Sequence, residues 1–369
     1  MAIDFTNPEP LYKQVAEDIR SKIARGELKE GDQLEPQEIL AQKYGVSMIT
    51  IKKAIGDLSN EGLLLTRAGK GTFVSRKSRG VDFAKHKTIG IVLRDFNSPY
   101  FSLIMQAVEE KASSMGINVL LSSSSNRAEK EESMINHYLE IGVGGLIIAS
   151  MARIYHATPI IRKLHDEGFP YIMVSYIDDE DIYFVGTDNE EGGYLAGVHL
   201  AKLGYRKIGY INGEVGNVVG EKRKKGFVKA LEEFGIEFDS KFEFHLRLRG
   251  EWNDYQSGYE IGEYFIGLSE KPEAMFVYND LSALGFQRAL IERGIRVPED
   301  VAIVGFDDIK RGVVAPVPLT TIHQPTDKIG EKAFEILLMR MDGKEVPVRT
   351  ILSPYVVVRE SCGANLKSS

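Results

Sequence analysis

The chain has 369 residues, 43% of them hydrophobic and 27% charged, which is typical of a globular protein with more than one domain. Its net charge of −7 is unevenly divided, because residues 1–87 carry 15 Lys and Arg against 12 Asp and Glu, whereas the remainder carries 31 against 41. This division confines any contact with a polyanion to the N-terminal part, and no apolar run approaches the ~20 residues that span a bilayer.

The start of the chain has no basic segment followed by an apolar one, so no export signal is seen and we expect a cytoplasmic protein. A single cysteine, Cys362, excludes an intrachain disulfide and a zinc site built from thiolates. The seven histidines include no His-x-x-x-His or His-Glu-x-x-His pair, so we expect no metal and no other cofactor.

The first predicted helix covers residues 8–24, and residues 34–60 predict two more helices separated by a tight turn. Gly45 supplies the turn, and Ser47 is placed to cap the helix that follows. One face of that helix is apolar at helical spacing, through Ile51, Ala54, Ile55 and Leu58. The opposite face carries Met48, Thr50, Lys52 and Lys53. An exposed basic helix held by a preceding short helix is typical of insertion into the DNA major groove.

A short basic hairpin is expected next, with β runs over residues 63–67 and 72–74 joined by a Gly-Lys-Gly turn. Such a wing can lay its backbone and its lysine against phosphates. The alternative is a small helical subdomain whose lysines only solvate its surface. The order of helix, turn, helix and basic wing favours DNA binding. The candidate DNA contacts are Ser47, Thr50, Lys52, Lys53, Arg67, Lys70, Gly71 and Thr72.

Residues 77–87 have the polar, aperiodic composition of a linker. From Thr88 onward, short apolar runs alternate with helical patterns, and this alternation restarts after about residue 193. The expected strands cover residues 89–93, 117–121, 145–149, 171–174, 207–211, 274–278 and 301–305. Continuous apolar strands separated by helices predict an α/β fold with parallel sheets covered on both faces. A last helix over 326–341 and two late runs, 349–352 and 355–358, could belong to either half.

Polar and aromatic residues follow several predicted strands, where sheets of this kind place their binding sites. Carboxylates and a guanidinium bind vicinal hydroxyls, and an indole covers the apolar face of a sugar ring. Taken singly, each aspartate could be a helix cap, and the only tryptophan could lie in a core. Their joint placement favours one site for a small molecule rich in hydroxyls. Its candidate residues are Tyr100, Phe101, Asp188, Arg223, Trp252, Asn279, Asp280 and Asp307.

Two other classes of protein share parts of this pattern. A solute-binding protein without a role in DNA regulation would bind a sugar in the same way, but the basic head and the missing export signal disfavour it. An enzyme is disfavoured because the glycine-rich stretch 209–220 contains neither Gly-x-Gly-x-x-Gly nor Gly-x-x-x-x-Gly-Lys-[Ser/Thr]. The adjacent carboxylates Asp307 and Asp308 tend to point apart, and His323 is expected to order a crossover and not to act as a base.

Two family resemblances meet in this chain. Residues 8–75 resemble the GntR-type winged-helix domain, through Gly45-Val-Ser-x-x-Thr-Ile-Lys-Lys-Ala54 and Gly69-Lys-Gly-Thr-Phe-Val74. Residues 88–362 resemble the effector domain of LacI-type repressors, through Asn97-Ser-Pro-Tyr-Phe101, Arg223-x-x-Gly-Phe227 and Val304-Gly-Phe-Asp-Asp308. The combination is similar to the arabinose-utilisation repressors.

The resemblance implies a winged helix-turn-helix domain over 1–76 and a two-lobed, periplasmic-binding-protein-like (type I) domain over 88–369. The N-lobe would cover about 88–187 and 324–353, and the C-lobe about 188–320 and 354–362. It further implies a homodimer on a palindromic double-stranded DNA operator, released by a small sugar, with L-arabinose favoured. Carried over by position, the effector contacts are Arg223, Trp252, Asn279, Asp280 and Asp307.

Two positions depart from the GntR pattern. Glu38 stands where the pattern usually has Arg, and Met48 stands where Arg follows the capping serine. Losing two basic side chains lowers the phosphate contribution to affinity and its salt dependence. Met48 and Ile49 offer apolar contact to a thymine methyl instead of a hydrogen bond to guanine.

We therefore predict that Thr50, Lys52, Lys53 and Lys70 carry more of the DNA binding, on an operator richer in A·T at the contacted steps. Selection of binding sites from a random duplex library measures this preference. An equal or stronger preference for G at those steps would show the prediction to be wrong.

Overall fold

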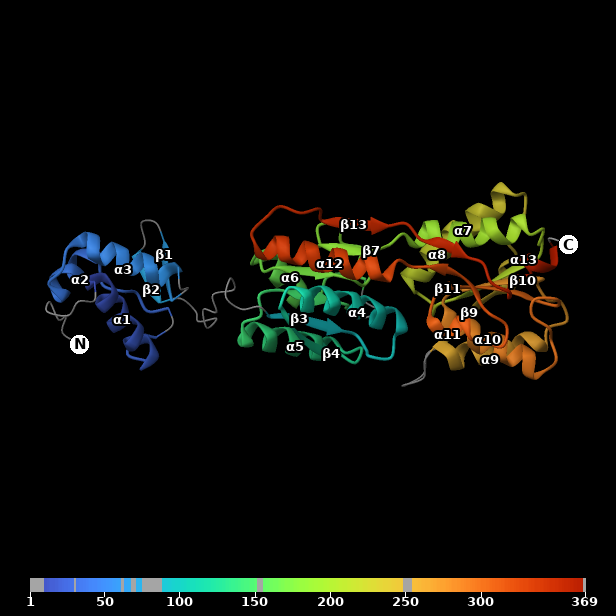
Figure 1. The fold of residues 1–369 in the computed structure, drawn as a ribbon, viewed down its shortest axis with the longest axis horizontal. Helices are drawn as coiled ribbons and strands as arrows, with labels where there is room; N and C mark the ends of the chain where they lie inside the picture. The colour runs from blue at the N-terminus through green and yellow to red at the C-terminus, as the bar shows by residue number, and fades with distance from the viewer. Residues whose placement is uncertain are drawn as a thin grey trace. The chain divides into compact units, whose positions relative to one another are not determined.

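The computed structural model describes residues 10–29, 31–60, 63–67, 71–74, 88–150, 155–247 and 254–367 (Figure 1). The described residues fall into two compact units. One contains the residues up to Gly90 together with Ile135–Gly144, and the other contains Ile91–Met134 and the residues from Gly145 onward. This division cuts through one strand and one helix, so the predicted domain borders and the linker over 77–87 stay predictions. None of the helices in the described ranges has the length and apolar character needed to cross a membrane.

The head contains three helices, α1 (Leu11–Ala24), α2 (Gln37–Tyr44) and α3 (Met48–Asn60). Gly45 ends α2 in the left-handed conformation with a φ of 66°. The backbone N–H of Thr50 donates to the Ser47 hydroxyl at 3.2 Å, which satisfies one of the unpaired donors at the start of α3. Both the turn and the cap predicted from the sequence are confirmed.

The predicted apolar face of α3 lies in the core of the head. Ile51, Ala54, Ile55 and Leu58 are each at most 4% exposed. A buried polar link accompanies this core, because Asp18 of α1 accepts a hydrogen bond from the Tyr44 hydroxyl at 2.8 Å and pairs with Lys22 at 2.7 Å.

Strands β1 (Leu64–Arg67) and β2 (Gly71–Val74) form the predicted hairpin, antiparallel and with Thr66 opposite Thr72. Gln33 bridges to Phe73 and extends this small sheet. The described part of the head is thus a winged helix-turn-helix, as the sequence predicted.

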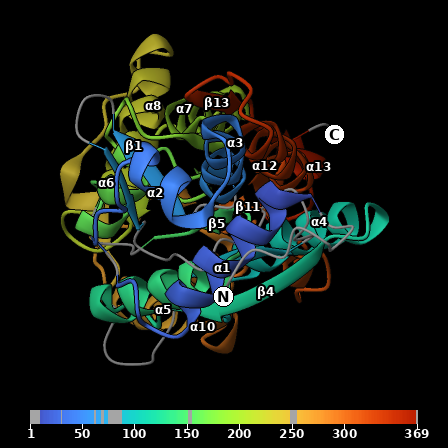
Figure 2. The ribbon, with the colours of Figure 1, turned by 90° about the vertical axis from the view of Figure 1, so that its left-hand side faces the viewer.

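The first six-stranded sheet has the order β13-β7-β6-β5-β3-β4 and defines the N-lobe. Its strands are β3 (Thr88–Leu93), β4 (Asn118–Ser123), β5 (Leu146–Ile148), β6 (Tyr171–Met173), β7 (Phe184–Thr187) and β13 (Arg349–Leu352). Its helices are α4 (Pro99–Ser114), α5 (Ala128–Ile141), α6 (Pro159–Asp166) and α12 (Thr326–Met341). Figures 1 and 2 show α12 lying alongside α4, although more than 200 residues separate them in the sequence.

The second six-stranded sheet has the order β14-β12-β11-β10-β8-β9 and defines the C-lobe. Its strands are β8 (Ile208–Asn212), β9 (Glu243–His245), β10 (Ala274–Val277), β11 (Ala302–Asp307), β12 (Thr320–His323) and β14 (Tyr355–Val357). Its helical segments are α7 (Asn189–Lys202), α8 (Val218–Glu233), η1 (Ser240–Phe242), α9 (Asp254–Ile266), α10 (Asp280–Glu292), α11 (Lys310–Val313) and α13 (Ala364–Lys367). The sequence predicted a parallel sheet, but strand β14 pairs antiparallel with β12. The prediction therefore fails at this edge strand.

The chain passes between the two sheets three times, from β7 to α7, from β12 to α12 and from β13 to β14. The two late runs, which the sequence left open, therefore divide, one joining each sheet. The third passage is braced in the C-lobe, where the His323 ring stacks on Tyr355 at 4.5 Å. Three connections between two lobes are compatible with a hinge that opens and closes a cleft.

Helices α7 and α8 lie in backbone contact because glycines face each other. A Cβ atom at Gly193 would lie 1.8 Å from the carbonyl oxygen of Arg223, and one at Gly226 would lie 1.8 Å from that of Glu190. Any larger side chain at either position must push the helices apart. This contact fixes where α8, and therefore Arg223, lies above the C-lobe sheet.

Candidate functional site

The candidate site lies at the carboxyl edge of the C-lobe sheet. Strands β8, β10 and β11 run parallel, so their final residues meet at the same edge. Tyr278 and Asn279 follow β10, and Asp307 ends β11. Helix α8 starts six residues after β8 and brings Arg223 to the same place.

The Arg223 guanidinium is immobilised at this edge. The side chain is 5% exposed, and its Nε atom donates to Asn189 Oδ1 at 3.0 Å. Its Nη1 atom donates to the Tyr278 carbonyl, and the guanidinium lies 3.6 Å from the centre of the Phe306 ring. Among the described residues, Nη2 has no protein acceptor. A planar cation with a fixed orientation and a remaining donor can bind a ligand oxygen.

Asp307 lies beside Arg223 in an unusual conformation. Its φ of 119° is rare for a residue other than glycine, and such outliers are often associated with functional sites. Its Oδ1 atom accepts a hydrogen bond from Gln324 Nε2 at 2.7 Å. Burial raises the pKa of Asp307 to about 6, although Arg223 and Gln324 act in the opposite direction.

Asn279 forms a second polar group of the site. Its Oδ1 atom caps α10 by accepting from the Ser282 backbone N–H at 2.9 Å, and its Nδ2 atom donates to Asp254. Burial raises the pKa of Asp254 despite this hydrogen bond. Asn279 is thus held from both ends of its amide group.

The N-lobe contributes Tyr100, near the start of α4. Burial raises the pKa of the Tyr100 phenol, and the carboxylate of Asp307 raises it further. The charge of Asp307 in the C-lobe is therefore felt at Tyr100 in the N-lobe. Phe101 is 4% exposed and packs edge to face on Tyr100 at 5.0 Å, which places it beneath the site as support.

Two predicted site residues have their carboxylates occupied by the protein. Asp188 caps α7 by accepting from the Glu191 backbone N–H at 2.9 Å. Asp280 is fully buried, and its two oxygens accept from the Ile309 backbone N–H at 2.9 Å and from the Thr321 hydroxyl at 2.6 Å. Trp252 lies outside the described residues, so its role stays a prediction.

Five further residues surround the same edge and were not predicted from the sequence, namely Arg94, Tyr155, Asp254, Tyr278 and Gln324. Arg94 and Arg223 both oppose the effect of burial on the pKa of Tyr155 and of Tyr278. The Nε atom of Arg94 is buried and makes no hydrogen bond among the described residues, but it lies 3.4 Å from Asp95 Oδ2 in an ion pair. Arg94 directly follows the predicted strand 89–93 and Tyr278 ends the predicted strand 274–278, and these positions were the available signal.

A cavity of about 510 Å³ opens between the lobes, which is within the usual size range of small-molecule sites. Its lining residues are sequence neighbours of the cluster just described. They are Asn97, Pro99, Ser102, Leu103, Gln106, Tyr255, Leu281, Ile309, Lys310 and Arg311.

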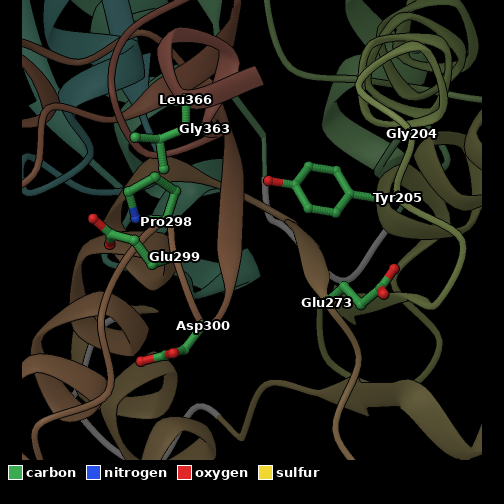
Figure 3. Close-up of a pocket in the computed structure, with 8 residues that line it drawn as sticks. All are labelled: Gly204, Tyr205, Glu273, Pro298, Glu299, Asp300, Gly363 and Leu366. Carbon is green, nitrogen blue, oxygen red and sulfur yellow. The ribbon is translucent and has the colours of Figure 1, made fainter. Parts of the chain in front are cut away.

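A second cavity, of about 260 Å³, lies at the opposite edge of the C-lobe sheet, where β8, β10 and β11 begin. Figure 3 shows the Tyr205 side chain pointing across it toward Pro298 and Gly363. The polar groups there are engaged by the protein, since Tyr205 donates to the Cys362 carbonyl at 3.0 Å and Asp300 pairs with Arg296. We assign this cavity a structural role.

The predicted DNA-binding residues differ in how far their side chains are available to contact DNA. On α3, Lys52 is exposed, whereas Lys53 lies 3.9 Å from the centre of the Tyr12 ring and the Thr50 hydroxyl bonds Ser47 at 2.8 Å.

On the hairpin, Thr72 is 7% exposed and its hydroxyl lies 3.2 Å from that of Thr66, so only its backbone can reach a phosphate. Gly71 has a φ of 111°, and a Cβ atom there would lie 2.4 Å from Gln33 Nε2. Lys70 and the side chain of Arg67 lie outside the described part of the chain.

Fold and site together define a DNA-binding regulator with a two-lobed domain for a small molecule. Residues 11–74 match bacterial regulatory proteins of the gntR family, and residues 198–362 match the periplasmic binding protein-like domain. The arabinose metabolism transcriptional repressor of Halalkalibacterium halodurans is 30% identical, over 96% of this chain and 96% of the relative. The HTH-type transcriptional repressor PurR of Mannheimia succiniciproducens is 30% identical, over 87% of this chain and 97% of the relative.

Among solved structures, a LacI family transcriptional regulator from Enterococcus faecium with bound ribose covers 74% of this chain and 98% of its own. It has a TM-score of 0.64 and 28% identity. The chain therefore belongs to the family of transcriptional repressors in which a GntR-type head precedes a LacI-type, periplasmic-binding-protein-like domain. The two resemblances and the fold class predicted from the sequence are confirmed.

Asp307 and its neighbour Asp308 should affect stability in opposite directions. Burial alone would raise the pKa of Asp308, but hydrogen bonds with His323 and Arg359 lower it. Asp307 has a raised folded-state pKa, so its ionised form destabilises the fold above about pH 6, and this cost falls as protonation proceeds at lower pH.

We predict that Asp307→Asn raises the free energy of unfolding at pH 7.5 by about 1–2 kcal/mol, with a smaller gain at pH 5. The matched change Asp308→Asn should lower it, because it removes an ion-paired acceptor. Urea unfolding at both pH values measures these effects. A loss of stability in Asp307→Asn at pH 7.5 would mean that its carboxylate is structural.

Proposed function

We propose that this protein is a sugar-responsive transcriptional repressor that binds a palindromic operator as a homodimer and leaves it when a small sugar occupies the cleft. The observation that carries this proposal is the fixed Arg223 guanidinium at the strand edge that also holds Asp307 and Asn279, with Tyr100 of the other lobe within its electrostatic influence. L-Arabinose is the favoured effector, because a relative that matches nearly the full chain is named for arabinose metabolism.

The chemistry of these groups suits a neutral sugar. In their described contacts, Arg223 leaves its Nη2 donor and Asp307 leaves its Oδ2 acceptor for adjacent hydroxyls, and hydrogen bonds that involve charged groups are strong. Tyr100 adds a ring that can pack on the apolar face of a pyranose or furanose. The E. faecium regulator of the same fold holds ribose, a sugar of this size.

Effector control requires that the sugar bind two lobe arrangements with different affinity. Contacts from both lobes provide this difference, because Tyr100 reaches the ligand together with Arg223 and Asp307 only when the cleft is closed. In the homodimer, a change in lobe arrangement would alter the spacing of the two heads and weaken their simultaneous fit to a palindromic operator. Operator binding places the protein in the cytoplasm, and no catalytic step is required.

A thermal-shift screen of free and phosphorylated sugars tests the proposal. A sugar at one hundred times its Kd should stabilise the wild type by about 2.7 kcal/mol through mass action, with a matching rise in Tm. Arg223→Ala should abolish the shift. Arg288→Ala, a matched change of an arginine that is 60% exposed on the same lobe, should retain it.

The same sugar should release a labelled operator duplex from the wild type, measured by fluorescence anisotropy. If no sugar shifts the wild type and a nucleoside or an amino acid does, the effector assignment fails. If the full chain does not bind duplex DNA of any sequence at low ionic strength, the regulatory role fails.

A further inference from the structure

The start of α8 is held by residues of both lobes. Its cap, Asn217, accepts from the Gly220 backbone N–H at 2.8 Å and donates to the Tyr278 hydroxyl at 3.3 Å, both within the C-lobe. The first turn of a helix leaves further N–H groups without partners. Tyr155 of the N-lobe lies near this turn, since the Val218 backbone lowers the pKa of its phenol against the effect of burial.

Lys222 makes a second contact between the lobes, one turn further along α8. Its ammonium lies 5.1 Å from the centre of the Tyr176 ring, in the segment that follows β6 of the N-lobe. The nearby Tyr176 phenol raises the pKa of Lys222. The same hydroxyl donates to Asp178 Oδ1 at 2.6 Å, so a carboxylate orients it toward the lysine.

The other lysines of α8 contact residues of the C-lobe and not of the N-lobe. In their described contacts, Lys224 pairs with Glu243 at 2.6 Å and Lys225 pairs with Glu190 at 2.8 Å. Lys229 lies 5.6 Å from the ring of Tyr194. All three partners belong to the C-lobe, whereas Lys222 alone among these four reaches the N-lobe.

Lys222 is adjacent to Arg223, and successive residues of a helix point about 100° apart. One side chain therefore faces the N-lobe while the next faces the ligand edge of the C-lobe sheet. The two N-lobe tyrosines also support each other, with ring centres 6.3 Å apart. The turn of α8 that holds Lys222 and Arg223 therefore responds both to the arrangement of the lobes and to contacts with the effector.

We propose that Tyr155, Tyr176 and Lys222 form a latch between the lobes that holds the first turns of α8 and so positions Arg223 for the effector. The latch favours the closed arrangement before any ligand binds, so that the effector completes a closure that the protein already samples. The role of the latch in effector binding rests on the proposed function. Its effect on the arrangement of the lobes does not require an effector. These are positioning residues, since they act through α8.

The test measures the distance between the lobes in the full-length protein without effector. Spin labels at Lys163→Cys on α6 and Glu232→Cys on α8 report on the two lobes, because both positions are exposed and the native Cys362 is fully buried. Mixing with an excess of unlabelled chain restricts the measured distances to pairs within one chain. Double electron–electron resonance then gives the populations of short and long distances.

Lys222→Met and Tyr176→Phe should each lower the ratio of closed to open populations about three- to tenfold, because each removes one side of the polar contact and keeps most of the side-chain volume. The matched control, Lys225→Met on the same helix, should leave the ratio unchanged. The latch is refuted if both variants retain the parent distribution, or if Lys225→Met changes the distribution equally.

A sugar titration of the same variants separates the two proposals. If a sugar binds the wild type, Lys222→Met should weaken its affinity by the same three- to tenfold factor, with Arg223 still present. If no sugar binds but the distances respond as expected, the latch stands and the sugar assignment falls. If a sugar binds and the distances do not respond, the latch falls and the proposed function stands.

Discussion

The placement of Arg223 is the constraint on which the rest of the structure depends. Its guanidinium is held by Asn189, by the Tyr278 carbonyl and by the Phe306 ring, all of which belong to the C-lobe. This geometry exists only because α8 lies against α7 in backbone contact, which the paired glycines permit. A cation fixed in this way adds little ordering cost when a ligand binds, so its hydrogen bonds contribute more fully to affinity.

Two adjacent aspartates near Arg223 differ in their effect on stability. Asp307 holds a partly buried carboxylate in an unfavourable backbone conformation, whereas Asp308 is neutralised by Arg359 and His323 beside a lobe crossing. Asp307 thus lies at the candidate effector site, whereas Asp308 is paired with residues beside a connection between the lobes. Such a pairing of a strained site with a well-satisfied support is common where a protein must change shape.

Much of the fold followed from the sequence because local periodicity and turn chemistry agree with the final packing. The apolar face of α3, the turn at Gly45 and the Ser47 cap appear where the pattern predicts them. The candidate site was predicted less completely. An aspartate after a strand has the same sequence signature whether it caps a helix, as Asp188 does, or lies at the candidate site, as Asp307 does.

Asp254 and Gln324 meet this site from positions distant in sequence, and no local pattern reveals such proximity. The burial of the Thr72 side chain could likewise not be predicted from the sequence, because a two-stranded hairpin alone does not indicate which of its faces is covered. The differences between the predicted and the observed environments of these residues arise from tertiary contacts. Local sequence preferences determine the helices and strands but not these contacts.

The most direct test of this account is the stability and ligand response of Gly193→Ala compared with Gly267→Ala. A Cβ atom at Gly193 collides with the backbone of Arg223, whereas one at Gly267 meets only an ordinary contact at 3.5 Å. We expect Gly193→Ala to lower the free energy of unfolding by about 1–3 kcal/mol and to lose the thermal response to the sugar that stabilises the wild type. Equal stability and an equal thermal response in the two variants would contradict the claim that the contact between α7 and α8 positions the effector site.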